Sequence, residues 1–394
     1  MAEQSQPDSP APALDPVALT GWLEDRTEEM VEKTVELASI ESPSRDGAAQ
    51  EPAREWLSAE LGELGFEVAR LAGEEGCDHL VATMPGGPDA PCQLLLGHFD
   101  TVWSVGTLSS MPLEVREGRL HGPGVFDMKG GIVQMLFALR AIGELGLELP
   151  VPPVIQLVAD EEIGSPTSRG YTEARAAEAA RVFVMEPSFG PAGALKTGRK
   201  GVGHFHLVVK GVASHAGLDP EGGVSAILEA SRQIERLFEL NDPAKGITVN
   251  VGTIDGGLRA NVVAPEATAE IETRVATASD AEAVESAILG LEPTRDRIEI
   301  EVSGGFGRPP MEKTPGNEAL WEQARAAAAA LGQGIGEAQV GGASDGNLTS
   351  PLAPTLDGLG AVGDGAHADH EPLIIEKMPE RAALLAALLA SPVA

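Results

Sequence analysis

The chain has few cysteines and no long apolar run. Cys77 and Cys92 are its only cysteines, too few for a disulfide framework or a thiolate metal cage. A metal site in this chain would therefore have to use histidine and carboxylate ligands. No segment approaches the roughly 20 apolar residues that cross a bilayer, and no basic region followed by an apolar stretch opens the sequence. We therefore expect a cytoplasmic protein.

Basic residues are also scarce relative to acidic ones. The sequence has 28 Lys and Arg against 60 Asp and Glu, which gives a formal net charge of −32. A field of that sign repels phosphate backbones and anionic lipid headgroups, so we expect neither nucleic acid nor membrane partners. The hydrophobic fraction of 43% is ordinary for a folded protein, and 394 residues favour two domains over one.

The order of predicted elements places one domain inside the other. Residues 1–15 are rich in Pro, Ser and Ala and are expected to form a disordered tail, with a helix beginning near Asp15. Residues 16–196 alternate short apolar runs with helical patterns, which predicts an α/β domain with a mixed, largely parallel sheet and helices on both faces. Residues 197–311 have the ferredoxin-like order β-α-β-β-α-β. Because residues 312–394 return to α/β alternation, this small α+β domain is inserted in the large one.

Acidic residues and a histidine follow three of the apolar runs directly. His98 and Asp100 follow LLLG, Glu161 and Glu162 follow IQLVAD, and Glu186 follows VFVM. Ligands of open α/β sheets sit at the carboxyl ends of the strands, so these side chains are site candidates. Taken singly, each has an ordinary structural alternative, such as a helix N-cap or a hydrogen-bonded surface residue.

Two further candidates complete a metal-binding set. Asp127 lies in a glycine-rich turn, and His367 lies in the loop before the terminal helix. Two imidazoles and three carboxylates suit a pair of divalent cations, whose four charges would be balanced by the carboxylates and one bridging hydroxide. Glu161 is then left to act as general base and later as general acid. Asp100 could hold the second ring nitrogen of His98.

The motifs GHFDTVW, GPGVFDMKGG, DEEIGS, MEPS, SHAG, RANVVAPEA, GGASDGN and GDGAHADHE occur in this order along the chain. In this order they resemble the aminoacylase and glutamate carboxypeptidase family of co-catalytic dinuclear zinc peptidases, most closely its glutamate carboxypeptidase branch. The resemblance implies that His98 and Glu186 bind one zinc ion, that Glu162 and His367 bind the other, and that Asp127 bridges them. It likewise assigns the general base to Glu161 and the orientation of His98 to Asp100.

The resemblance also assigns roles within the inserted domain, which serves as a lid and dimerisation domain in the family. His215 of SHAG would stabilise the oxyanion, a contribution of roughly 3 kcal/mol, and in relatives it reaches the partner subunit of a homodimer. Asn261 matches a carbonyl-binding residue and Arg274 a carboxylate-binding one, although Arg274 could instead belong to a charged outer sheet face. Gly342 could bring bare backbone near the substrate.

The remaining histidines are not assigned to the site. His370 is the one real ambiguity, because HADHE contains two imidazoles, and the family spacing of His, three residues and Glu selects His367 with Glu371. His79 and His121 fall in turn-like surroundings.

Together these features predict a cytoplasmic, homodimeric metallocarboxypeptidase. It would use two Zn²⁺ per subunit, with Co²⁺ or Mn²⁺ as alternatives, and release a C-terminal amino acid, glutamate, from a peptide or N-acyl conjugate through a metal-bridging hydroxide. The negative field of the chain opposes an anionic substrate, so the zinc pair and Arg274 would have to supply a local positive patch. The alternatives are an N-acyl amino acid deacylase, a succinyl-diaminopimelate desuccinylase, a dipeptidase, and a catalytically silent binding protein with the same fold.

Overall fold

The computed structural model describes residues 14–87 and 91–393, which divide into two compact units. Unit 1 comprises the described residues up to Thr197, Lys313–Ala338 and those from Leu348 onward. Unit 2 comprises Gly198–Glu312 and Gln339–Asn347. Except for its last two residues, the tail expected over residues 1–15 lies outside the described part of the chain.

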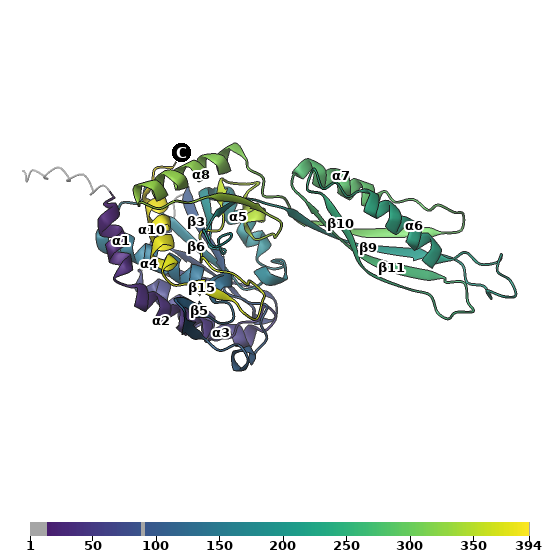
Figure 1. Ribbon diagram of the computed structural model, residues 1–394, viewed down its shortest axis with the longest axis horizontal. Coiled ribbons are helices and arrows are strands. Elements are labelled where there is room, and N and C mark those ends of the chain that lie inside the picture. The colour runs from purple at the N-terminus through teal and green to yellow at the C-terminus, as the bar shows by residue number, and fades with distance from the viewer. Residues whose placement is uncertain (1–13, 88–90, 394) are drawn as a thin grey trace, which may run out of the picture. The chain divides into compact units, whose positions relative to one another are not determined.

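Unit 1 is built on a six-stranded sheet (Figure 1). Its strands, in the order in which they pair, are β1 (Glu67–Leu71), β2 (His79–Thr83), β6 (Pro153–Val158), β3 (Cys92–His98), β7 (Ala179–Val184) and β14 (Thr355–Leu356). The pairs β6–β3, β3–β7 and β7–β14 are parallel, while β1 and β2 are antiparallel to their neighbours. This confirms the predicted mixed, largely parallel sheet.

Both faces of this sheet are covered. Leu95 of β3 packs into a core that includes side chains of α1, α2, α4, α8 and α10, whereas Leu94 and Leu96 pack on the opposite face with Ala176 of α5. Such double burial explains why the central strands read as continuous apolar runs. The helices of unit 1 are α1 (Pro16–Glu24), α2 (Thr27–Ala38), α3 (Gly47–Glu63), α4 (Gly130–Leu145), α5 (Arg169–Glu178), α8 (Pro315–Ala330) and α10 (Lys377–Ala390).

The first helix begins where the sequence predicts. The side chain of Asp15 accepts hydrogen bonds from the backbone N–H groups of Val17 and Ala18, and Pro16 occupies the first helical position. Within residues 14–87 and 91–393, no helix combines the length and the apolar character needed to cross a bilayer.

Short elements, which the sequence patterns did not predict, also shape unit 1. A three-stranded sheet contains β15 (Pro372–Ile374), β5 (Arg119–His121) and β4 (Glu114–Arg116) in that order. Single turns of helix occur at η1 (Glu74–Gly76), η2 (Thr107–Ser109), η3 (Val125–Lys129), η4 (Glu161–Ile163) and α9 (Gly346–Thr349). Strands of three residues are too short to show the alternation of apolar and polar residues that predicts a strand. The pairing of β15 with β5 nevertheless brings the loop after β5 close to the loop before β15.

Unit 2 has the predicted ferredoxin-like order. It runs β9 (Gly201–Lys210), α6 (Ala226–Glu239), β10 (Thr248–Gly256), β11 (Glu266–Val275), α7 (Ala278–Leu289) and β12 (Glu299–Arg308). The antiparallel sheet has the order β10-β11-β9-β12, and side chains of α6 and α7 pack with Phe205, Leu207 and Ile271 on one of its faces. β8 (Leu195–Arg199) pairs with β13 (Glu337–Val340) in the connecting segments.

The predicted boundary at residue 312 misses one segment of unit 2. Residues 339–347, which include most of GGASDGN, cluster with unit 2 although the sequence analysis assigned them to the large domain. Arg308 Nη1 lies 2.7 Å from Asp345 Oδ1, and the Asn347 side-chain amide donates to the carbonyl of Pro309 at 2.8 Å. Hydrogen bonds between segments far apart in the sequence make this attachment, including one from the backbone N–H of Lys200 to the carbonyl of Val340, so a pattern-based boundary could not include it.

Candidate metal centre

The three central strands of unit 1 end beside one another. β3 lies between β6 and β7 and runs parallel to both. His98 is the last residue of β3, Glu161 begins the turn η4 after β6, and Glu186 lies two residues beyond β7. Parallel pairing therefore brings together polar side chains that are far apart in the sequence.

The structure places the five predicted metal ligands in contact. His98 Nε2 lies 3.3 Å from Asp127 Oδ1 and 3.5 Å from Glu186 Oε1. His367 Nε2 lies 2.9 Å from Glu162 Oε2 and 3.6 Å from Asp127 Oδ2. Asp127 thus presents one carboxylate oxygen to each imidazole, which is the geometry that a bridging ligand needs.

The unsatisfied atoms at this position fit metal ions. His98 Nε2 and Asp127 Oδ1 are buried, and neither has a hydrogen-bond partner of normal geometry among the described residues. Buried polar atoms are rarely left unpaired, so a cation between them would account for both. The donors form two overlapping groups whose ligand atoms lie within 4.8 Å of one another, namely His98 with Glu161 and Glu186, and His98 with Asp127 and Glu162. Nitrogen and oxygen donors of this kind suit Zn²⁺, Co²⁺ or Mn²⁺.

The carboxylates generate a strongly negative potential at both imidazoles. Burial disfavours the charged form of His98, but Asp100, Asp127 and Glu186 together raise its pKa well above the usual value. The carboxylate of Glu162 raises the pKa of His367 to about 9. The potential that favours a proton on each ring would favour a divalent cation more.

Asp100 both orients His98, as the sequence predicts, and binds the backbone of the turn η4, which was not predicted. His98 Nδ1 lies 3.0 Å from the backbone oxygen of Asp100 and 3.4 Å from its carboxylate, so both groups orient the imidazole. The two carboxylate oxygens also accept the backbone N–H groups of Glu161 and Glu162, each at 3.2 Å. Asp100 is fully buried and thereby links the end of β3 to the turn η4.

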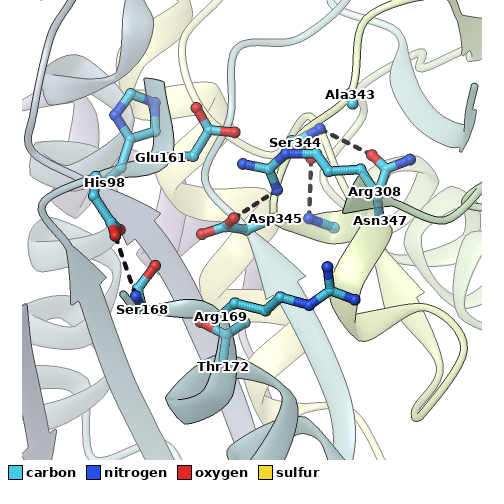
Figure 2. Close-up of polar contacts among 12 residues, drawn as sticks. His98, Glu161, Ser168, Arg169, Thr172, Arg308, Ala343, Ser344, Asp345 and Asn347 are labelled. Carbon is cyan, nitrogen blue, oxygen red and sulfur yellow. Dashed lines mark hydrogen bonds and ion pairs between the residues drawn. The ribbon is translucent and has the colours of Figure 1, made fainter. Parts of the chain in front are cut away.

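Glu161, the predicted general base, lies beside the ligands. Its carboxylate belongs to the same group as His98 and Glu186, and Figure 2 shows the His98 and Glu161 side chains next to each other. The side chain is partly exposed, so a water molecule could reach it. The geometry allows Glu161 to exchange a proton with a solvent molecule held among the ligands.

A buried hydrogen-bond network next to η4 was not predicted from the sequence. Asp160 Oδ2 accepts the backbone N–H groups of Thr167 at 2.7 Å and of Ser168 at 3.1 Å, and Figure 2 labels Ser168. His79 Nε2 lies 3.0 Å from Thr167 Oγ1, and Ala159 N–H donates to His79 Nδ1 at 3.1 Å. The expectation that His79 lies in a turn is wrong, because it is the buried first residue of β2. The apolar run LVAT after it was the signal for a strand.

Unit 2 brings two of its predicted site residues together. The backbone N–H of Ala216 donates to the carbonyl of Asn261 at 3.0 Å, which places Asn261 beside His215. His215 Nδ1 accepts the backbone N–H groups of Gly217 at 3.2 Å and Leu218 at 3.1 Å. These bonds require Nδ1 to be unprotonated, so Nε2 carries the hydrogen and can act as a donor.

Arg274 contacts the glycine turn that the sequence analysis associated with substrate. Its Nη1 donates to the carbonyl of Gly341 at 2.7 Å, and its Nε donates to Glu272 at 2.8 Å. The carbonyl of Gly342 accepts from Arg199 Nη1 at 3.1 Å. Two nitrogens of the Arg274 guanidinium group are therefore already hydrogen-bonded within unit 2. The pairing with Glu272 agrees with the alternative in which Arg274 belongs to a charged outer face of the sheet.

Arg308 is a buried cation of unit 2 that was not among the residues singled out in the sequence. It pairs with buried Asp345, and Figure 2 shows the two side chains joined by this contact. Arg308 ends a strand of alternating polar and apolar residues and precedes two prolines, so its position resembled that of an ordinary strand end.

We expect a divalent cation to stabilise unit 1. Removing metal with dipicolinate should lower the thermal unfolding midpoint, because the clustered carboxylates then repel one another. A cation at a thousandfold its dissociation constant contributes about 4 kcal/mol to unfolding free energy. Calorimetry combined with elemental analysis of the treated protein measures both effects.

Two variants control this experiment. His98→Ala should unfold at nearly the same temperature with and without the chelator, since it lacks a central ligand. His206→Ala removes an exposed imidazole that pairs with Glu270 in unit 2, and it should keep the full response to the chelator. A wild-type midpoint that does not change when bound metal is removed would contradict the metal centre.

Several known proteins are similar to this chain in sequence or in structure. A sequence model described as peptidase family M20/M25/M40 matches residues 94–391. Carboxypeptidase G2 from Pseudomonas sp. (strain RS-16) is 30% identical over 365 residues, which cover 91% of this chain and 88% of that protein. The crystal structure of aminopeptidase PepT from Bacillus cereus matches with a TM-score of 0.72 at 22% identity, covering 92% of this chain and 98% of that one.

A second solved structure is described as a dinuclear metal-binding peptidase of the M20 family from Bacillus subtilis. It matches with a TM-score of 0.68 at 17% identity and covers 93% of this chain and 98% of its own. These structural likenesses show a shared fold. The family match and the full-length sequence relationship show that this chain belongs to peptidase family M20/M25/M40 and is a hydrolytic enzyme of the metallopeptidase kind.

Proposed function

We propose that the chain is a dinuclear zinc metallocarboxypeptidase. It hydrolyses the amide bond of a peptide or N-acyl conjugate and releases a C-terminal amino acid, with glutamate as the expected product. The observation that carries this proposal is the convergence of His98, Asp127, Glu162, Glu186 and His367 around Glu161 in one unit. The 30% identity to carboxypeptidase G2 supports the carboxypeptidase branch.

Zinc is the proposed ion, with Co²⁺ or Mn²⁺ as substitutes, because imidazole and carboxylate donors suit all three and the Irving–Williams order favours Zn²⁺ over Mn²⁺. When bound, the two cations would polarise the scissile carbonyl and make an attacking water more acidic. Cys77 and Cys92 are both free thiols, which supports the proposed cytoplasmic setting.

Proton transfer is the task proposed for Glu161. Its carboxylate takes a proton from the attacking water and then delivers it to the nitrogen of the leaving amino acid. Asp100 holds the backbone amides of Glu161 and Glu162 at 3.2 Å, so the base and a ligand keep a fixed relation to His98. A base fixed in this way does not have to reorganise during the reaction.

Substrate recognition is assigned to residues of unit 2. His215 Nε2–H and the side chain of Asn261 would donate to the carbonyl oxygen as charge develops on it, a contribution of roughly 3 kcal/mol per donor. Arg274 would bind the free carboxylate of the released amino acid, with the backbone at Gly342 beside the substrate. To bind a carboxylate through two nitrogens, Arg274 has to release the hydrogen bond from its Nε to Glu272.

A homodimer through unit 2 is also part of the proposal. β10 is an edge strand of the four-stranded sheet, and Ile254 on this strand is 53% exposed. Ile227 and Phe238 of the adjacent helix α6 are 42% and 48% exposed. An open strand edge beside exposed apolar side chains is suited to pairing with a second copy.

Replacing Glu161 by Gln should separate metal binding from turnover. The variant should retain two metal ions per chain and lose activity by about 10²–10⁴-fold, because an amide cannot accept the proton. Steady-state kinetics and metal analysis measure the two properties. Glu173→Gln, which alters a surface pair with Arg169, serves as the control and should stay fully active. Near-normal turnover by the Glu161 variant would remove that residue from the mechanism.

Replacing Arg274 by Ala should discriminate between substrates. We expect kcat/KM to fall about 10–100-fold for N-acyl glutamates and dipeptides with a free carboxylate, and less for their C-terminal amides, since a charge-assisted hydrogen bond is lost. Equal losses on both sets would assign Arg274 to the outer sheet face. A panel that adds succinylated amines and acetylated amino acids distinguishes a carboxypeptidase from a deacylase or desuccinylase.

Subunit mixing tests whether His215 acts in the partner subunit. His215→Ala and Glu161→Gln homodimers should each be nearly inactive. After random subunit exchange, about a quarter of wild-type activity should return if His215 acts across the dimer, because half of the dimers are mixed and each has one intact site. A mixture that stays inactive after exchange, or an active monomer in sedimentation, would overturn this arrangement.

A further inference from the structure

We propose that Glu371 is the positioning residue of the metal centre: its carboxylate binds the backbone of the turn that carries Asp127 and so fixes the bridging ligand against the loop that carries His367. This inference rests on the proposed two-metal site. It assigns Glu371 no contact with substrate and no proton transfer.

Glu371 is fully buried, and both of its carboxylate oxygens are used. Oε1 accepts the backbone N–H groups of Phe126 at 2.9 Å and Asp127 at 3.0 Å. Oε2 accepts the backbone N–H of Gly124 at 2.9 Å and the indole N–H of Trp103 at 3.0 Å. One carboxylate therefore joins the loop after β3 to three amides of the Asp127 turn.

The Asp127 turn needs such an acceptor because its backbone is irregular. Gly124 has a φ of 71°, and Asp127 has φ and ψ of −117° and 94°, outside the helical region. The amides of this turn therefore cannot all be satisfied by a regular helical ladder, and a buried amide without an acceptor is unfavourable. The Glu371 carboxylate provides acceptors for three of them at once.

The same residue connects the turn to the second imidazole ligand. His367 precedes Glu371 by four residues, and the backbone N–H of Glu371 donates to the carbonyl of Ala368 at 3.1 Å. The backbone N–H of Gly122 in turn donates to the carbonyl of Glu371 at 3.1 Å. The main chain and the side chain of Glu371 thus hold the Asp127 turn against the His367 loop. In this arrangement Asp127 Oδ2 lies 3.6 Å from His367 Nε2.

The Asp127 turn also carries a buried lysine. Lys129 is buried at the end of the same turn, and its ammonium group donates to the carbonyl of Ile40 at 2.7 Å. Burial lowers the pKa of Lys129 to about 8, and the nearby carboxylate of Glu371 opposes that shift. Burial likewise raises the pKa of Glu371 to about 7, while the backbone N–H donors of Gly124, Phe126 and Asp127 favour its charged form.

Replacing Glu371 by Gln gives the sharpest test, because the amide has nearly the same shape but one end becomes a donor. In either orientation that end faces two N–H groups, so half of the hydrogen bonds are lost. We expect the second Co²⁺ equivalent of the reconstituted enzyme to bind about 10–100-fold more weakly, with an altered visible absorption spectrum. The value of kcat should fall with it, while KM stays within about twofold, since the substrate groups are untouched.

Glu41→Gln is the matched control. The carboxylate of Glu41 also lies in unit 1 and accepts two backbone N–H groups, those of Gly106 at 2.8 Å and Leu108 at 3.0 Å. This variant should lose thermal stability without any change in Co²⁺ affinity or spectrum. If Glu371→Gln does the same, Glu371 is only structural and the proposal fails.

A second variant keeps the test valid if Glu371→Gln does not fold. Trp103→Phe removes one of the four donors and should weaken the second Co²⁺ equivalent about 2–5-fold, in the same direction. Unchanged Co²⁺ binding in Trp103→Phe together with loss of folding in Glu371→Gln would overturn the proposal. Cobalt titration needs no substrate, so a wild-type enzyme that binds two Co²⁺ but cleaves no amide would refute the proposed function and leave this test intact.

Discussion

Mutual repulsion among closely placed carboxylates is the constraint on which the rest of this structure depends. Asp100, Asp127, Glu161, Glu162 and Glu186 gather at the ends of three parallel strands, in a chain that is already strongly acidic. Such a group is stable only if other charges and hydrogen bonds compensate it. Imidazoles, backbone amides and divalent cations are the compensating groups that this site can use.

Backbone amides bind three buried carboxylates at or beside this cluster. The carboxylate of Asp100 accepts the amides of η4, that of Asp160 accepts the amides beyond it, and that of Glu371 accepts the amides of the Asp127 turn. In each case a buried carboxylate replaces a regular hydrogen-bond ladder and gives an irregular turn one defined shape. The turns that carry the proposed ligands are therefore held by acids outside the proposed ligand set.

Unit 2 carries hydrogen-bond donors that neighbouring backbone groups hold in place. The neutral tautomer of His215, set by two backbone donors, presents an N–H group, and the Arg274 fork is aligned by a carbonyl of the glycine turn. These groups are donors, whereas unit 1 provides acceptors. The proposed reaction would need both kinds of group, because an amide substrate has a carbonyl oxygen that gains negative charge and a nitrogen that must gain a proton.

Sequence alone determined the sheet class and the inserted ferredoxin-like order, and it indicated the candidate ligand residues, because apolar periodicity and the polar residues after each run are local properties. It did not determine that residues 339–347 attach to unit 2 or that Glu371 binds the Asp127 turn. Those features depend on hydrogen bonds between segments up to 247 residues apart, as from Gly124 to Glu371. No local pattern encodes such a contact, so only the tertiary structure decided them.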